Sequence, residues 1–423
     1  MTTQYVIATL YAALCIVSFA CAKNINITKK QSIYMVSAVL IAGAVLRRYF
    51  ALQPLTYHYD IYFFREWGDA IVLFGSKNVY SSGMFLDYPP GYMYVLWLST
   101  LVKNFVGLSH TGRGYTFVIK SPAMAADILS AIIIYYIACK KLDEKTAVFL
   151  SRAYTFCPAI IYNSSIWGQI DSWYTLFILL SILFVTENKV VLASVSYAIA
   201  LITKPQALLF GPVLLFWVIS KKDIKVFLKA VVTGLGCIWL MALPFSQTIS
   251  PFWLIDLYIN TFGGYKYFTV NGYNIYMLAG LNFVELGDSM AAAMINPAVI
   301  FICFIFCAWS YFRFKNPARN FSTAVVLISV FFSFCTMMHE RYLHPAIILA
   351  VMAYIYCKNK GWLAVALGFS AANYLNVAGS MHRNILLVDI PVHYSNFTSI
   401  LTVATTVLAL CLACAPQTYN ADK

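Results

Sequence analysis

Hydrophobic residues occur along this chain in long, nearly uninterrupted stretches that alternate with short polar segments. The apolar stretches run to roughly 17–22 residues, which is the length that an α-helix needs to cross the hydrocarbon core of a bilayer. The polar segments between them are too short to fold as a separate soluble domain. The pattern therefore predicts an all-α, polytopic membrane protein in which residues 1–423 form a single domain.

About thirteen segments have the length and hydropathy expected of membrane spans. They are 4–22, 31–50, 122–139, 146–163, 171–187, 190–203, 205–220, 226–244, 291–312, 321–337, 342–357, 361–377 and 397–414. We divide the chain into an additional N-terminal span within residues 1–30, a core module in residues 31–220, and variable C-terminal spans in residues 221–423. The core module contains a first outer loop at 51–121, and the C-terminal part contains a second one at 245–290.

The basic residues predict the orientation of these spans, because loops rich in Lys and Arg stay in the cytoplasm. The formal net charge of +13 is concentrated in a few short loops, so it indicates membrane orientation and not binding of nucleic acid. These loops carry Lys23, Lys29 and Lys30; Lys140, Lys141 and Lys145; Lys221, Lys222, Lys225 and Lys229; Arg313, Lys315 and Arg319; Lys358 and Lys360. Counting crossings from them places the chain's other charged patches together on the extracytoplasmic side.

One apolar segment conflicts with this count. Between the outer residue Asp87 and the inner residue Lys140 the chain has to cross an odd number of times, yet two apolar segments, 91–107 and 122–139, lie there. We expect 91–107 to be an interfacial or re-entrant helix, because it follows two prolines and contains Lys103. The alternative is that the positive-inside rule fails at Lys140 and that both segments cross.

Only 11% of the residues are charged, and several of these charges lie at the ends of apolar segments. Charges near hydrocarbon are costly, so such patches are candidate functional sites. Five patches share this placement: His58–Asp60, Asp87–Pro90, Trp167–Asp171, Lys204–Gln206 and His339–Tyr342. If all five lie on one side of the membrane, they form one site.

Two of these patches suggest specific chemistry. Asp60 at the membrane boundary can act as a general base, or it can be a solvated acid paired with Arg65 or His58. The tight connection that contains His339 and Arg341 is the sharpest signal, because arginine binds phosphate through two parallel hydrogen bonds and histidine can donate a proton or a hydrogen bond near neutral pH. A solvated loop is the alternative there.

The other three patches each have a structural explanation beside the functional one. Asp171 lies in the first turn of an expected helix, where the helix dipole favours an acid. Lys204 can hold a phosphate, or its long side chain can snorkel to the interface. Asp87 precedes two prolines that restrict the backbone, which also suits a purely structural turn.

Six short stretches together resemble a known family. They read HYDIYFFREW, LDYPPGYMY, RGYTFVIK followed by ADIL, WGQIDSWYTL, ITKPQALLFGP and MHERYLHP. In order and spacing the chain resembles the GT-C superfamily of polyprenyl-phosphate-sugar-dependent glycosyltransferases, especially the lumenal glucosyltransferases of the N-glycan pathway, which use dolichyl-phosphate glucose, and their bacterial relatives. The resemblance covers most of the first 220 residues and returns at 339–344. Two features depart from it: the additional span 4–22, and Asp171 in place of an uncharged residue.

The resemblance implies an inverting hexosyltransferase, glucosyl- or mannosyl-, that moves a sugar from a polyprenyl phosphate to an acceptor hydroxyl on the extracytoplasmic face. It implies that Asp60 is the catalytic base and that Arg341, His339 and Lys204 bind the donor phosphate. Further substrate-binding residues would be Asp87, Tyr88, Gln169, Asp171, Gln206, Glu340 and Tyr342.

The expected partners are the polyprenyl-phosphate-linked donor, a glycan, lipid-linked or glycopolymer acceptor, and the lipid bilayer. No cofactor is required if basic side chains hold the phosphate, although Asp60, Asp87 and Asp171 leave a divalent metal open because hard cations bind oxygen ligands. We expect the protein in a bacterial plasma membrane with its active site outside, the ER membrane being the alternative. The competing function is a transporter or flippase for lipid-linked sugars, but the internal duplication typical of transporters is not visible in the sequence.

Overall fold

The computed structural model describes residues 1–22, 26–250, 252–264, 266–287 and 289–415. Lys23, one of the expected orientation residues, lies outside them. Within the described residues six helices are long and apolar enough to cross a membrane by length and composition. These are α1 (Thr2–Ala22), α2 (Lys29–Ala51), α5 (Arg113–Lys141), α11 (Ile224–Ala242), α14 (Met290–Arg313) and α18 (Val392–Cys414). The protein is therefore an all-α polytopic membrane protein.

Shorter apolar helices complete the bundle. They are α8 (Asp171–Thr186), α9 (Val190–Thr203), the 3₁₀ turn η3 (Pro205–Phe210) that continues into α10 (Gly211–Lys221), α15 (Arg319–Phe334) and α16 (Pro345–Cys357). The remaining helical elements are α3 (His58–Phe74), η1 (Val79–Ser81), α4 (Pro90–Val106), α6 (Glu144–Thr155), α7 (Pro158–Ile161), η2 (Tyr162–Trp167), η4 (Leu243–Phe245), α12 (Trp253–Gly263), α13 (Ile275–Leu278) and α17 (Gly361–Leu386). Most of the expected apolar segments correspond closely to these helices. The exception is 146–163, which is divided into α6, α7 and η2 because Pro158 begins a new helix. A total of thirteen crossings remains a prediction.

Helix ends follow local chemistry. Thr28 and Gln31 form a capping box at the start of α2, and Asp143 accepts a hydrogen bond from the Thr146 amide at the start of α6. Pro158 begins α7 and Pro345 begins α16, where the missing amide hydrogen of proline costs nothing. The sequence between the apolar segments therefore contains the signals that start the helices.

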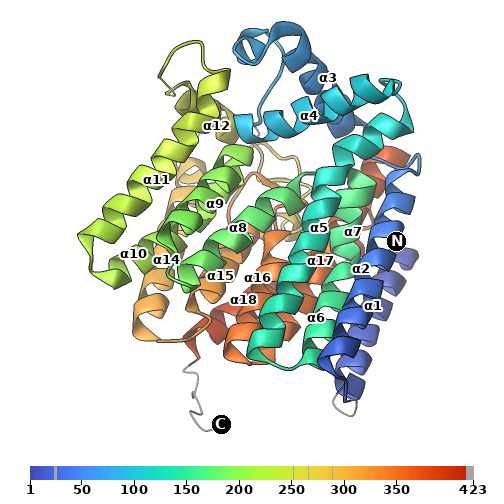
Figure 1. Cartoon of the computed structure of the whole chain (residues 1–423), viewed down its shortest axis with the longest axis vertical. Coiled ribbons are helices and arrows are strands. Elements are labelled where there is room, and N and C mark those ends of the chain that lie inside the picture. Colours follow the sequence, from blue (N-terminus) through green and yellow to red (C-terminus); the bar gives the residue numbers. More distant parts are fainter. Residues whose placement is uncertain (23–25, 251, 265, 288, 416–423) are drawn as a thin grey trace.

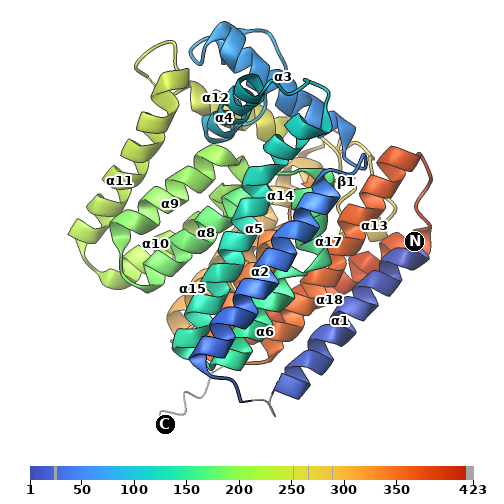
Figure 2. The ribbon, with the colours of Figure 1, turned by 45° about the vertical axis from the view of Figure 1, so that its right-hand side comes forward.

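The two ends of the bundle differ. Helices α3, α4 and α12 lie across one end, at the top of Figures 1 and 2, whereas the turn between α5 and α6 lies at the other. Basic residues at that turn, such as Lys140 and Lys141, were expected to face the cytoplasm. Helix α4 corresponds to the segment 91–107, and the interfacial placement expected for this segment remains a prediction.

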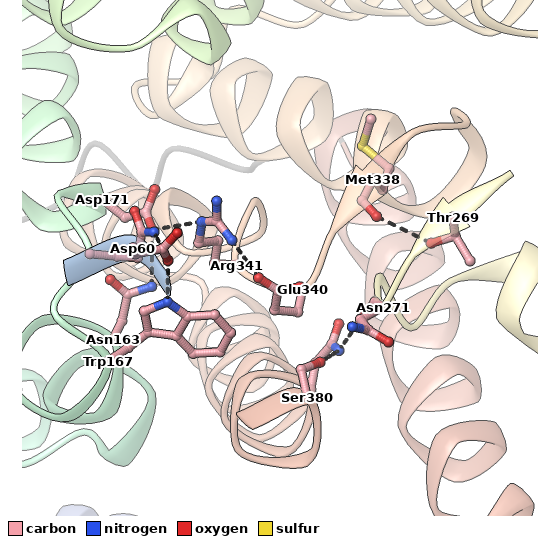
Figure 3. Close-up of polar contacts among 12 residues, drawn as sticks. Asp60, Asn163, Trp167, Asp171, Thr269, Asn271, Met338, Glu340, Arg341 and Ser380 are labelled. Carbon is pink, nitrogen blue, oxygen red and sulfur yellow. Dashed lines mark hydrogen bonds and ion pairs between the residues drawn. The ribbon is translucent and has the colours of Figure 1, made fainter. Parts of the chain in front are cut away.

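The loop 245–290, expected to be an outer loop, is structured in its described part and pairs with the segment that follows α15. Its strand β1 (Thr269–Val270) pairs in parallel with β2 (Met338–His339), with Thr269 opposite Met338 and Val270 opposite His339. Thr269 Oγ1 also donates a hydrogen bond to Met338 O at 3.2 Å (Figure 3). This short sheet ties the loop to the segment that carries His339 and Arg341.

Candidate active site

Asp60 lies in the first turn of α3, where two side chains from a distant segment bind it. Trp167 Nε1 donates a hydrogen bond of 2.7 Å to Asp60 Oδ2, and the Gln169 amide donates a second one to the same oxygen. Tyr88 OH in turn donates to Gln169 Oε1 at 3.2 Å. Within the described residues both of these bonds reach Oδ2, and Asp60 keeps partial solvent exposure. Arg65 instead donates to Thr116, so the expected alternative of an Asp60–Arg65 pair is wrong.

The segment that presents Trp167 has an unusual backbone. Residues Tyr162–Trp167 form a single π-helical turn, η2, a feature that is frequent at functional sites. Gly168 follows with φ +95°, and a Cβ atom there would lie 2.8 Å from Ile61 Cδ1 and 2.9 Å from Lys120 Cε. Only glycine allows this turn to approach α3 so closely, and the approach brings Trp167 and Gln169 to Asp60.

A buried ionic cluster lies beside Asp60. Asp171 is fully buried and accepts hydrogen bonds from the Lys204 ammonium and, at 3.0 Å, from the Asn163 amide. Arg341 Nε lies 4.0 Å from Asp171 Oδ2, and Figure 3 shows Asp60, Asp171 and Arg341 side by side. The helix dipole alone does not account for Asp171, because two cations from other parts of the chain surround it.

The connection between α15 and α16 contributes Arg341 and its neighbours. Arg341 donates to Glu340 Oε1 at 2.5 Å, and His339 and Glu340 are 8% and 3% exposed, so a solvated loop is ruled out here. Burial lowers the pKa of Arg341, but the carboxylates of Glu340 and Asp60 outweigh it and hold that pKa well above its ordinary value. Burial together with the nearby cations Arg341 and Lys204 lowers the pKa of His339 well below its usual range. This shift favours the neutral form of His339, which binds an anion through a ring N–H.

Aromatic rings surround the cationic groups. The Lys204 ammonium lies 5.7, 5.6 and 5.9 Å from the ring centres of Tyr88, Tyr174 and Tyr342, and the Arg341 guanidinium lies 5.9 Å from that of Trp167. Such rings attract cations through their negative faces. They help to keep two buried positive charges in place beside a cavity.

A cavity of about 460 Å³ opens next to this cluster. At one end it is lined by polar side chains, namely those of Asp87, Lys204, Gln206, His339 and Arg341. Its other walls, from α10, α14 and α15, are mostly apolar and include Val299, Cys303, Phe304, Leu327 and Phe331. The Gln206 side-chain oxygen and Arg341 Nε are buried atoms without a hydrogen-bond partner among the described residues. Both residues line the cavity, and each keeps a polar atom that no described residue binds.

The eleven residues singled out from the sequence thus gather at one end of the molecule. Asp60, Tyr88, Gln169 and Asp171 belong to the hydrogen-bonded cluster, and the cavity lining supplies most of the others. Glu340 contacts Arg341 and does not line the cavity. Sequence reasoning missed three participants that lie inside expected spans or beside them: Asn163, Tyr174 and Lys120. The only local signal for Asn163 was the Gly168 that follows it and permits the sharp turn.

The three acids Asp60, Asp87 and Asp171 do not assemble into a shared group. Within the part of the chain that the structure describes, no cluster of three or more His, Cys, Asp or Glu residues is arranged to hold a metal ion. Asp171 is already bound by Lys204 and Asn163, which leaves it unsuited to a metal.

Apolar spans and a buried polar site beside a cavity define an integral membrane protein with an enzyme-like centre. A family model for glycosyltransferase family 87 matches residues 85–337, which is more than half of the chain. The chain belongs to glycosyltransferase family 87, and it is a multi-pass membrane glycosyltransferase. Asp60 and the segment His339–Tyr342 lie outside the matched residues.

Comparison with curated proteins found no match. Among solved structures the chain is similar to the crystal structure of ArnT from Cupriavidus metallidurans bound to undecaprenyl phosphate. The TM-score is 0.48 at 13% sequence identity, and the match covers 92% of this chain and 78% of ArnT.

Proposed function

We propose that the protein is an inverting glycosyltransferase that moves a hexose, glucosyl or mannosyl, from a polyprenyl-phosphate-linked donor to an acceptor hydroxyl on the extracytoplasmic side of the membrane. The observation that carries this proposal is the cavity of about 460 Å³, which joins a cationic end beside Asp60 to apolar walls of membrane helices. A lipid-linked sugar phosphate has the same division into an anionic headgroup and an apolar tail.

The donor phosphate would bind at the polar end of the cavity. Arg341 can use its unpartnered Nε, and neutral His339 can donate a ring hydrogen. The Lys204 ammonium is already bound by Asp171. We therefore expect Lys204 to act mainly by making the electrostatic potential at the site more positive. The isoprenoid tail would run along the apolar walls, where burying each CH₂ group contributes about 0.8 kcal/mol.

Asp60 would serve as the general base. Trp167 and Gln169 hold its Oδ2 atom, which leaves Oδ1 to take the proton from the acceptor hydroxyl. The acceptor oxygen attacks the anomeric carbon while the bond from that carbon to the phosphate oxygen breaks. The polyprenyl phosphate leaves as an anion beside Arg341, and the single displacement inverts the anomeric configuration.

The remaining polar residues of the cluster would orient the two substrates. Asp87, Tyr88, Gln206 and Tyr342 line the cavity near its polar end, where they can contact sugar hydroxyls. Membership in a glycosyltransferase family favours an enzyme over the alternative of a transporter. We further propose a bacterial plasma membrane as the location and a glycan, lipid-linked or glycopolymer acceptor.

The test uses purified full-length protein with a panel of polyprenyl-phosphate glucose and mannose donors, and follows sugar release or transfer and the product anomer. We expect Asp60→Asn to lower turnover by about 10²–10⁴-fold, the usual contribution of a general base, while donor binding persists. Asp69→Asn is the matched control, because Asp69 lies on the same helix and does not line the cavity. Its carboxylate pairs with the Lys103 ammonium at 2.6 Å. Near-normal turnover by Asp60→Asn would remove Asp60 from this role. Failure to consume any of these donors would contradict the donor class.

A further inference from the structure

The π-helical turn beside the site is held by its own backbone and also by side chains from other elements. Asn163 O accepts the amides of Gly168 and Gln169 at 3.0 and 3.1 Å. Further along the turn, the carbonyls of Ser165 and Ile166 accept hydrogen bonds from Lys120. The carbonyl of Trp167 accepts one from Thr56. The carbonyls at a helix end need such external donors.

Lys120 provides two of these hydrogen bonds. Its ammonium donates to Ser165 O at 3.0 Å and to Ile166 O at 2.8 Å. The side chain is fully buried within α5, and no ion pair to it occurs among the described residues. A buried cation in a membrane helix is costly without a carboxylate partner, which points to a role in holding the carbonyls that it binds.

The carbonyls bound by Lys120 directly precede the residues that contact Asp60. Trp167 Nε1 and the Gln169 amide both reach Asp60 Oδ2, and Gly168 lies between these two residues. A Cβ atom at Gly168 would lie 2.9 Å from Lys120 Cε and 2.8 Å from the side chain of Ile61, the residue after Asp60. Lys120, the turn and the start of α3 are therefore packed so closely that no side chain fits at position 168.

We propose that Lys120 is a positioning residue, which fixes the turn 165–169 so that Trp167 and Gln169 aim their hydrogen bonds at Asp60. This inference rests on the proposed role of Asp60 as the base. Lys120 does not line the cavity. It acts through the turn, and its loss misplaces the groups that orient the base.

The experiment compares Lys120→Met, which keeps an unbranched side chain but removes the ammonium, with Lys140→Met as control. Lys140 lies on the same helix at the opposite end and stacks on Tyr136 at 4.0 Å. We expect Lys120→Met to lower kcat about 10–100-fold, the scale of a 1 Å misplacement at a reacting centre, with the KM for the donor within about twofold. The control keeps both constants within about twofold. A normal kcat for Lys120→Met would overturn the proposal.

A double-mutant cycle separates positioning from general structural damage. If Lys120 acts through the indole, Lys120→Met combined with Trp167→Phe costs little more than the larger single effect, because residues that act as a unit are not additive. Fully multiplicative effects would overturn the proposal. Should Lys120→Met fail to fold, Gly168→Ala shifts the same turn from the other side and should give the same loss of kcat at unchanged KM.

A readout that does not depend on catalysis keeps this inference distinct from the proposed function. Hydrogen exchange measured by mass spectrometry should be about tenfold faster or more at 164–170 in Lys120→Met, with no change in α8 or α16. Unchanged exchange at 164–170 would overturn the proposal that Lys120 fixes this turn. If Asp60→Asn transfers sugar normally while exchange is accelerated in Lys120→Met, the role of Asp60 as the base is wrong. The role of Lys120 in fixing the turn is then still supported.

Discussion

Two buried ionic clusters in this protein have similar composition and different surroundings. The outer cluster joins Asp171, Lys204 and Arg341 and borders the cavity. The inner one joins Arg47 of α2 to Asp127 of α5 at 2.8 Å, with both side chains at most 1% exposed, and neither residue lines that cavity.

The inner pair makes further hydrogen bonds within the protein. Arg47 also donates to Thr155 O at 2.9 Å, and Asp127 also accepts from Ser164 at 2.6 Å, so the pair links several helices. Both clusters keep buried polar atoms without a hydrogen-bond partner among the described residues, namely Arg47 Nη2 and Asp127 Oδ1 in the inner pair and Arg341 Nε in the outer cluster. They differ in that only the outer cluster borders the cavity. Burial of charge in a membrane domain therefore does not by itself mark a site. A buried charged group that also borders a cavity does indicate a site.

The largest effect should come from breaking the inner pair. Arg47→Met leaves Asp127 as an uncompensated buried charge, which we expect to lower the free energy of unfolding by about 3–5 kcal/mol. The specific activity of the protein that remains folded should stay within about threefold. Denaturant titration in detergent, together with activity per folded molecule, measures both.

The double variant Arg47→Met, Asp127→Leu is the control for that prediction. It removes both charges and should recover much of the lost stability, because well-packed apolar residues often replace a buried ion pair at little cost. A fully stable Arg47→Met protein would show that the pair does not hold these helices together.

In the outer cluster, replacing the arginine by methionine should lower the catalytic rate. Arg341→Met removes the donor expected to offset the charge on the leaving phosphate, so we predict a loss of about 10²–10³-fold in kcat. Arg383→Met is the matched control, since Arg383 donates to Asn271 at 3.3 Å and does not line the cavity. Equal losses in the two variants would contradict a specific role for Arg341.

A smaller effect should depend on pH. Burial raises the pKa of Asp87 from 3.8 to about 6, so Asp87 becomes an anion beside the donor phosphate as the pH rises from 5 to 7. We expect the KM for the donor to increase over this range by less than about tenfold. Steady-state kinetics of Asp87→Asn should lack this increase, and an identical pH profile in both proteins would exclude Asp87 as its source.

The same shift affects the stability of the fold. Because the folded-state pKa of Asp87 lies above the ordinary value of 3.8, the folded protein binds more protons than the unfolded chain between pH 4 and 6. Asp87 therefore lowers stability as the pH rises through that window and keeps it lower above pH 6. Asp87→Asn should remove this contribution to the slope.

The sequence alone was sufficient for the fold class and for most helix bounds. Hydrocarbon excludes unpaired backbone groups, so long apolar runs have to be helices, and the segment expected at 190–203 is helix α9 with the same limits. Charge scarcity also sufficed to choose the candidate patches, because a charge near hydrocarbon is retained only for a reason.

Only the tertiary structure decided how those patches meet. Nothing in the local sequence indicates that Trp167 and Gln169 bind Asp60, or that Asp171 holds Lys204, because these contacts join residues more than thirty positions apart. They depend on a π-helical turn that Gly168 permits and that Lys120, more than forty positions away, holds in place. Hydropathy places a residue at a depth in the membrane, whereas the packing of helices determines which residue it faces.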